Sequence, residues 1–210
     1  GACAGFGSAQ ECQVTIDGAK TANATFGFAP QAVTWTNLVG TTATGNTLSK
    51  PTGGTTGWNA GASSTKGIAS GDGYAEFIAT ASNVFWMAGL SNGDTDTSYA
   101  DIDFAVYAYG TGNAYVFESG VNKASLGSYQ AGDVFRVEYQ GGSIRYRKNG
   151  VVKYEHSATV TYPLLLDASL YTPGAVIGSA ALAGTLTAPP AFPTPEAVVR
   201  TKLPVPPSRS

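Results

Sequence analysis

The sequence predicts an all-β protein, built as an antiparallel two-sheet β-sandwich of the jelly-roll type. The first observation is composition, because 27 of the 210 residues are glycine, threonine is frequent, and lysine, glutamate and leucine are few. This composition is typical of strands joined by tight turns. The second observation is that apolar and polar residues alternate over short runs, which is the period of a strand with one buried face. The third is the regular spacing of turn residues between these runs.

Nine runs are predicted to be strands, and no stretch has the periodicity of a long helix. They cover residues 33–39, 74–80, 84–90, 101–109, 133–139, 143–148, 151–156, 163–170 and 174–182. In the fourth run, the alternation predicts that the even-numbered residues from Ile102 to Ala108 share the buried face. Trp35 and Trp86 lie inside predicted strands and are expected in the core.

One turn is predicted with its conformation. Asn149 and Gly150 separate two predicted strands. Both central positions of a type I′ turn need positive φ, which asparagine and glycine adopt most readily. The sequence therefore predicts a tight β-hairpin at this point.

Composition divides the chain into three parts. Residues 1–29 contain both cysteines and a hairpin-like pattern, and residues 30–187 contain the predicted sandwich. Residues 188–210 contain seven prolines. This tail is excluded from a helix or a central strand and is expected to be extended.

The charge balance excludes several classes of protein. Only 12% of the residues are charged, and the formal net charge is −2. Binding of nucleic acid through a basic face is therefore not expected, nor is a polybasic membrane surface. One histidine and two cysteines are too few for a multi-histidine metal centre or a zinc ribbon. Two stretches without charge, residues 21–49 and 168–195, are too polar or too broken by proline and glycine to be membrane spans.

Cys3 and Cys12 are the only cysteines. Without a CxxC motif, and in a chain whose composition is that of an extracellular protein, they are predicted to form a disulfide that closes the N-terminal hairpin. Lipid modification of Cys3 is the alternative.

Segments between residues 71 and 154 resemble the concanavalin-like and SPRY-like jelly-roll modules of bacterial surface proteins. The resemblance is carried by residues 71–77, 89–94, 101–105, 132–137 and 144–151. Its most specific part is a Gly-Asp-Val entry, an apolar strand, a Gly-Gly turn and the Lys-Asn-Gly hairpin, in that order. The resemblance as a whole extends over residues 32–183. It implies two packed antiparallel sheets and an extracellular location, with adhesion or glycan recognition more often than catalysis.

The first part of the chain is similar to the end of an internalin B-repeat of the β-grasp type. The similarity is carried by Cys-Gln-Val-Thr-Ile-Asp at residues 12–17 and by residues 19–26. It implies a partial surface repeat, whose strands cannot form a core alone. They must pack on the sandwich, pair with another chain, or belong to a longer protein.

Four aspartates within ten residues form a candidate calcium site. They are Asp94, Asp96, Asp101 and Asp103, with Asn92 beside them. Calcium prefers six to eight oxygen ligands, although the spacing differs from that of an EF-hand loop. An Asx-rich turn that leads into a strand is the alternative. No other cofactor is expected.

Catalytic residues are not predicted. A glycoside hydrolase needs two carboxyl groups on either side of the scissile bond. Asp101 and Asp103 would share one strand face, but no glutamate follows them before Glu118. His156 could act as a base for a serine, but the chain has no Gly-x-Ser-x-Gly elbow and this histidine is expected at the surface.

Exposed aromatic rings are the remaining candidates for ligand binding, because sugars stack on them. The candidate ligand-binding residues are Trp58, Asn92, Tyr99, Tyr107 and Tyr109. The sequence thus favours a non-catalytic module of the cell surface that binds a glycan or another surface polymer. A structural subunit of an extracellular filament, self-associating through its terminal segments, is the first alternative. A glycoside hydrolase is the second.

Overall fold

The computed structural model describes residues 28–187, which form antiparallel strands joined by turns and one short 3-10 helix, η1 (Tyr99–Asp101). The predicted all-β architecture is confirmed for this part of the chain. The predicted hairpin with Cys3 and Cys12 lies outside the described residues, as do the repeat-like segment at residues 12–26 and the proline-rich tail.

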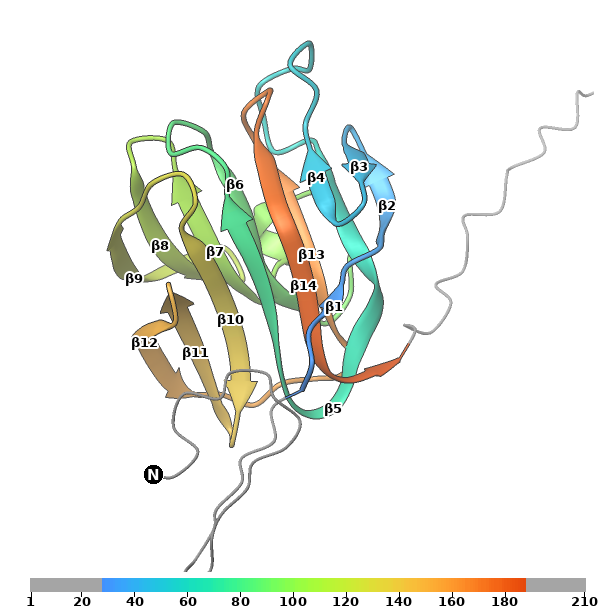
Figure 1. Cartoon of the computed structure of the whole chain (residues 1–210), viewed down its shortest axis with the longest axis vertical. Helices are drawn as coiled ribbons and strands as arrows, with labels where there is room; N and C mark the ends of the chain where they lie inside the picture. The colour runs from blue at the N-terminus through green and yellow to red at the C-terminus, as the bar shows by residue number, and fades with distance from the viewer. Residues whose placement is uncertain (1–27, 188–210) are drawn as a thin grey trace, which may run out of the picture.

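One long strand, β5 (Gly61–Ala79), belongs to both layers of the sandwich (Figure 1). Its first half pairs with β2 (Trp35–Val39) and β13 (Leu164–Leu170). Its second half pairs with β10 (Val134–Gln140) and β14 (Val176–Thr187). Hydrogen bonds therefore join the two layers into one network of 14 strands.

The remaining strands extend the two layers on either side of β5. The first layer continues from β10 to β11 (Ser143–Lys148) and β12 (Val151–Ser157), and from β14 to β1 (Gln31–Ala32), β4 (Thr47–Ser49) and β3 (Thr42–Thr44). The second layer continues from β13 to β6 (Trp86–Ser91), β7 (Phe104–Tyr109), β8 (Asn113–Glu118) and β9 (Val121–Ser128).

The core lies between the layers and is centred on three aromatic side chains. Phe77 and Phe135 come from the first layer and Trp86 from the second, and all three are fully buried. Trp86 meets each phenylalanine edge to face, with centroids 5.8 Å and 6.3 Å apart. Trp35 is also buried, so both tryptophans predicted for the core are confirmed there.

The hairpin predicted at Asn149 and Gly150 is confirmed. The two residues have φ values of 51° and 78° and connect the paired strands β11 and β12. A second hairpin of the same kind, β8–β9, turns at Ser119 and Gly120, with φ values of 44° and 79°. This hairpin and the first half of β5 were not predicted from the sequence.

One face assignment in the sequence analysis was wrong. Ile102 was placed on the same face as Val106 and Ala108. The structure has η1 and an extended residue before β7, so the alternation starts only at Phe104. Ile102 therefore packs with Met87 and Ala105 in a small cluster separate from the main core.

A glycine in β6 is required by a close approach of the backbone. A Cβ atom added to Gly89 would lie 1.8 Å from the Phe104 carbonyl oxygen and 2.8 Å from the Ala105 Cα. Both are backbone atoms of the paired strand β7, so no side-chain movement relieves the clash.

We expect Gly89→Ala to lower the free energy of unfolding by about 3 kcal/mol or more, because it overpacks a central strand. Gly53→Ala is the control, since a Cβ there has no heavy atom within 4 Å. Urea denaturation measures both variants. Equal stabilities of the two would contradict the described β6–β7 packing.

Candidate functional site

The outer face of the second layer is covered by two loops. The acidic loop, residues 92–103, connects β6 to β7, and the tryptophan loop, residues 51–59, leads into β5. Beneath them lies the small apolar cluster of Met87, Ile102 and Ala105, which Trp58 and Tyr99 cover. The two loops thus rest on a small core of their own, on the side away from the main one.

Eight aromatic rings lie against one another on this face, and we call them the aromatic tract. They are Trp58, Phe85, Tyr99, Tyr107, Tyr109, Tyr115, Phe117 and Tyr171. Neighbouring centroids are 4.9–6.4 Å apart, a range in which aromatic pairs attract one another. Tyr109 is exposed and the other seven rings are half-buried. The tract therefore presents ring surface to solvent on a packed base.

Trp58 is central to the tract. Its ring contacts those of Tyr99, Tyr107 and Tyr171, with centroids 5.0, 5.7 and 5.2 Å apart. Burial among the neighbouring tyrosines raises the pKa of Tyr107 to about 12. Its hydroxyl is therefore neutral at physiological pH and can both donate and accept hydrogen bonds.

The buried side chain of Lys50 holds the tryptophan loop in place. Its side chain is 3% exposed, and burial lowers its pKa. The ammonium group is within 2.6–3.1 Å of four oxygens, one from the Asn59 side chain and three backbone carbonyls, those of Gly57, Leu170 and Tyr171. This lysine therefore joins the loop that carries Trp58 to the end of β13, which Tyr171 directly follows.

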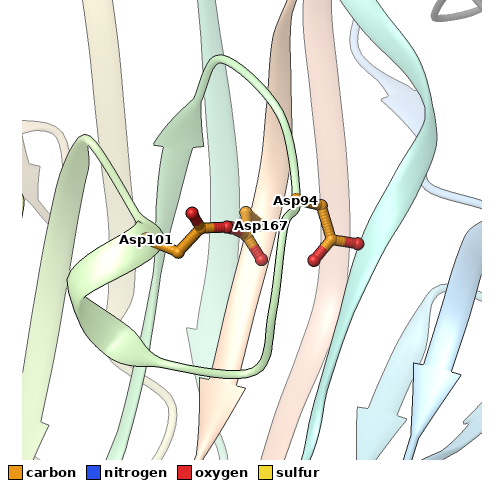
Figure 2. A group of neighbouring side chains, drawn as sticks. All are labelled: Asp94, Asp101 and Asp167. Carbon is orange, nitrogen blue, oxygen red and sulfur yellow. The ribbon is translucent and has the colours of Figure 1, made fainter. Parts of the chain in front are cut away.

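Three aspartates form an acidic cluster beside the tract. Asp94 and Asp101 come from the acidic loop and Asp167 from the middle of β13, and one oxygen of each lies within 4.8 Å of the others. Figure 2 shows Asp101 and Asp94 on either side of Asp167. Among residues 28–187, none of the three forms an ion pair with a basic side chain.

Asp167 is the most unusual of the three. Its side chain is 3% exposed, and its Oδ2 atom has no hydrogen-bond partner. Burial raises its pKa well above the ordinary value, and the charges of Asp94 and Asp101 raise it further. A hydrogen bond from the Ala168 backbone offsets only part of this effect.

Hydrogen bonds from neighbouring residues hold the side chains of Asp94 and Asp101 in place. Asp94 accepts a hydrogen bond of 3.0 Å from the Asn37 amide on β2. Asp101 accepts two from Thr95, one from its backbone N–H at 2.7 Å and one from its hydroxyl at 2.6 Å. Their carboxylates are therefore oriented by the protein.

The structure brings together only part of the predicted metal set. Asp96 accepts from the Ser98 backbone and Asp103 from the Asn92 backbone, so these two stabilise the acidic loop itself. Neither belongs to the acidic cluster. Asp167 was not predicted as a site residue, although a single acidic residue in an otherwise uncharged strand is a usable signal.

Four of the five predicted ligand-binding residues meet in the aromatic tract. They are Trp58, Tyr99, Tyr107 and Tyr109. Asn92 is exposed and donates instead to the Pro163 carbonyl, 3.0 Å away. The tract has four further members that were not predicted from the sequence, namely Phe85, Tyr115, Phe117 and Tyr171.

His156 lies on β12, the edge strand of the first layer, and is half-exposed. Its Nε2 atom is 2.6 Å from the Glu118 carboxylate, which also accepts a hydrogen bond from the buried Tyr146 hydroxyl at 2.9 Å. This group joins β8 of the second layer to β11 and β12 of the first. Among the hydrogen bonds of the described residues, none joins His156 to a serine hydroxyl.

No family profile matches the sequence, and no curated protein does. Several solved structures are similar in fold. The SPRY domain of human HERC1 is 18% identical, with a TM-score of 0.46, over 75% of this chain and 98% of that one. The VIP36 exoplasmic/lumenal domain, in a Ca2+/Man3GlcNAc-bound form, is 10% identical, with a TM-score of 0.49, over 77% and 86%.

The alginate lyase AlgAT5, from polysaccharide lyase family 7, is 15% identical, with a TM-score of 0.43, over 61% of this chain and 68% of that one. At these TM-scores the similarities assign neither a family nor an activity to the chain. Within residues 28–187, no helix has the length and apolar character needed to cross a membrane.

We expect Lys50→Met to lower the free energy of unfolding by about 3 kcal/mol, because it leaves buried carbonyl oxygens without a donor. It should also shift Trp58 fluorescence to the red, since the loop is released. Urea denaturation followed by tryptophan emission measures both effects. The control is Lys66→Met, an exposed lysine whose ammonium group donates to the Gln31 side chain. An unchanged spectrum in Lys50→Met would refute the role of this lysine in holding Trp58.

We expect Asp167→Asn to stabilise the metal-free protein by about 1–3 kcal/mol, because an amide can donate to the neighbouring carboxylates where a carboxyl oxygen stays unpaired. The gain should grow as the pH rises above about 4. Above the ordinary value of 3.8 the unfolded chain loses this proton while the folded chain keeps it, so wild-type stability falls with rising pH. Thermal melts in a chelating buffer from pH 4 to pH 8 measure the difference, and a gain that shrinks with rising pH would contradict the assignment.

Proposed function

We propose that the chain is a non-catalytic recognition module that binds a polysaccharide, or a similar polar surface polymer, through the aromatic tract. The observation that carries this proposal is the tract itself, eight contacting rings on one face of the sandwich. Seven of them are only half-buried, and Tyr109 is exposed. Flat rings with hydroxyl groups at their edges provide stacking and hydrogen bonding to sugars at a low entropic cost.

The charge pattern supports a polymer of low charge as the ligand. No basic side chain belongs to the tract, and the cluster next to it is acidic. An anionic polymer would have to approach Asp94 and Asp101 without a lysine or arginine to balance its charge. We therefore expect neutral glycans to bind better than acidic ones.

The environment of the carboxyl groups argues against hydrolysis at this face. A glycosidase needs a protonated carboxyl group that reaches the glycosidic oxygen. Asp167 has the raised pKa that an acid requires, but its side chain is almost completely buried. The two aspartates considered from the sequence, Asp101 and Asp103, both accept backbone hydrogen bonds in the acidic loop.

We include calcium in this proposal as a structural ion beside the aromatic tract. Calcium is the cofactor that the aspartate-rich segment of the sequence suggests. An extracellular or cell-surface location is also included, because low charge and binding to surface polymers suit a secreted protein. Neither point depends on the terminal segments.

A second candidate function is assembly into a filament. Exposed apolar residues lie on edge strands at both ends of the second layer, namely Leu38 and Val39 on β2 and Val121 on β9. Edge strands with apolar side chains pair readily with other chains, and head-to-tail contacts that do not close into a ring give filaments. Sedimentation of the full chain distinguishes this function, because a concentration-independent monomer excludes it.

We expect Trp58→Ala and Tyr109→Ala to weaken polymer binding by about tenfold or more each, because each removes ring surface from the tract. The full chain is applied to an array of neutral and acidic polysaccharides, and the strongest hit is titrated with each variant. Tyr74→Ala is the control, since Tyr74 is half-buried in the first layer against Arg136. An array without a hit, or equal losses in all three variants, would contradict the proposal.

A further inference from the structure

We propose that Asp94, Asp101 and Asp167 hold one calcium ion between the acidic loop and β13. The ion orders the part of the loop that carries Tyr99. This ordering of the loop deepens the proposed function and rests on it. Cation binding itself is independent of any polymer.

The spacing of the carboxylates suits one calcium ion. Two oxygens on opposite sides of such an ion lie about 4.8 Å apart, twice the Ca–O distance of about 2.4 Å. One oxygen from each aspartate lies within 4.8 Å of the others. A single ion between them can therefore contact all three side chains without a large movement of the backbone.

Asp167 points to a ligand independently of this clustering. It belongs to a central strand, paired on both sides with β5 and β6, and all seven residues of that strand are buried. Its Oδ2 atom has no partner among the described residues. Ionising a buried carboxyl group that has one oxygen without a donor is costly in free energy, and a bound cation offsets that cost.

The charge balance of the cluster also favours a divalent cation. Three carboxyl groups converge, and the basic side chains that form ion pairs within residues 28–187 are engaged elsewhere. Asn37 and Thr95 orient Asp94 and Asp101 but add no charge. Three carboxylates supply three to six oxygens, and water completes the shell of a calcium ion. Magnesium requires near-ideal octahedral geometry, which side chains from a loop and a strand provide less readily.

The position of the ligands connects the ion to the aromatic tract. Asp94 and Asp101 lie on either side of the loop segment that contains Thr97 and Tyr99. Thr97 donates to the Trp58 carbonyl at 3.3 Å, and its own carbonyl accepts from Ser169 on β13 at 2.6 Å. An ion bound to both aspartates would thus fix the segment that meets Trp58.

The first test is calorimetric titration of the chelator-treated full chain with calcium chloride, and separately with magnesium chloride. We expect one calcium ion per chain, weaker magnesium binding, and a higher melting temperature with calcium. Asp167→Asn and Asp94→Asn should each weaken calcium binding about a hundredfold, because each removes one of three charged ligands. Asp96→Asn is the matched control from the same loop and should bind like the wild type.

Asp167→Asn separates loss of the site from loss of the fold. This variant should be more stable than the wild type without calcium and should gain almost nothing when calcium is added. No calcium binding at millimolar concentration by the wild type overturns the proposal. So does wild-type binding by Asp167→Asn, or an equal loss in Asp96→Asn.

The second test is polymer binding with calcium and with a chelator. A chelator should weaken it in the wild type, and in Asp167→Asn binding should be weak under both conditions. Equal polymer binding in calcium and chelator overturns the ordering role of the ion. Calcium binding by a chain that binds no polymer contradicts the proposed function and leaves the cation site standing.

Discussion

The sandwich depends on β5, which is paired in both layers. Its 19 residues place β2 and β13 against one half and β10 and β14 against the other. This continuity is possible because the strand has glycines where the backbones come closest. A Cβ atom at Gly73 would lie 2.6 Å from the Ala183 carbonyl oxygen. The position of β13, and hence of Asp167 and Tyr171, therefore follows from the path of one strand.

The sequence predicts most of the strands because apolar and polar residues alternate along them. Strands β10 and β11 alternate between apolar core residues and a polar face, on which only Glu138 is buried, and Asn149 with Gly150 defines the turn that follows. Strand β8 was missed because both of its faces carry apolar side chains, Ala114 and Val116 in the core and Tyr115 and Phe117 in the aromatic tract. Two apolar faces remove the alternation on which the prediction depends.

The site was predicted in part for a similar reason. Asp94 and Asp101, and four of the five candidate ligand-binding residues, were found because polar and aromatic residues in loops are visible in a sequence. Asp167 comes from a strand 66 residues after Asp101, and only the pairing of β13 with β6 brings it to the acidic loop. Lys50 was not predicted because the four oxygens around its ammonium group come from two segments more than 100 residues apart in the sequence, and no local pattern predicts this.

Lys50 and Asp167 are two buried ionisable groups of opposite kind near the same outer face, and their different environments strengthen the case for a cation. The Lys50 ammonium is surrounded by four oxygens, so the protein already holds one positive charge there with oxygen ligands. Asp167 has the inverse environment, since other carboxylates lie next to it and one of its oxygens has no donor. Each loop that covers the face thus has a buried ionisable group at its base, and only the one beneath the tryptophan loop has all its polar atoms paired by the described residues. A divalent cation would give the acidic loop the same kind of attachment to β13 that Lys50 gives the tryptophan loop.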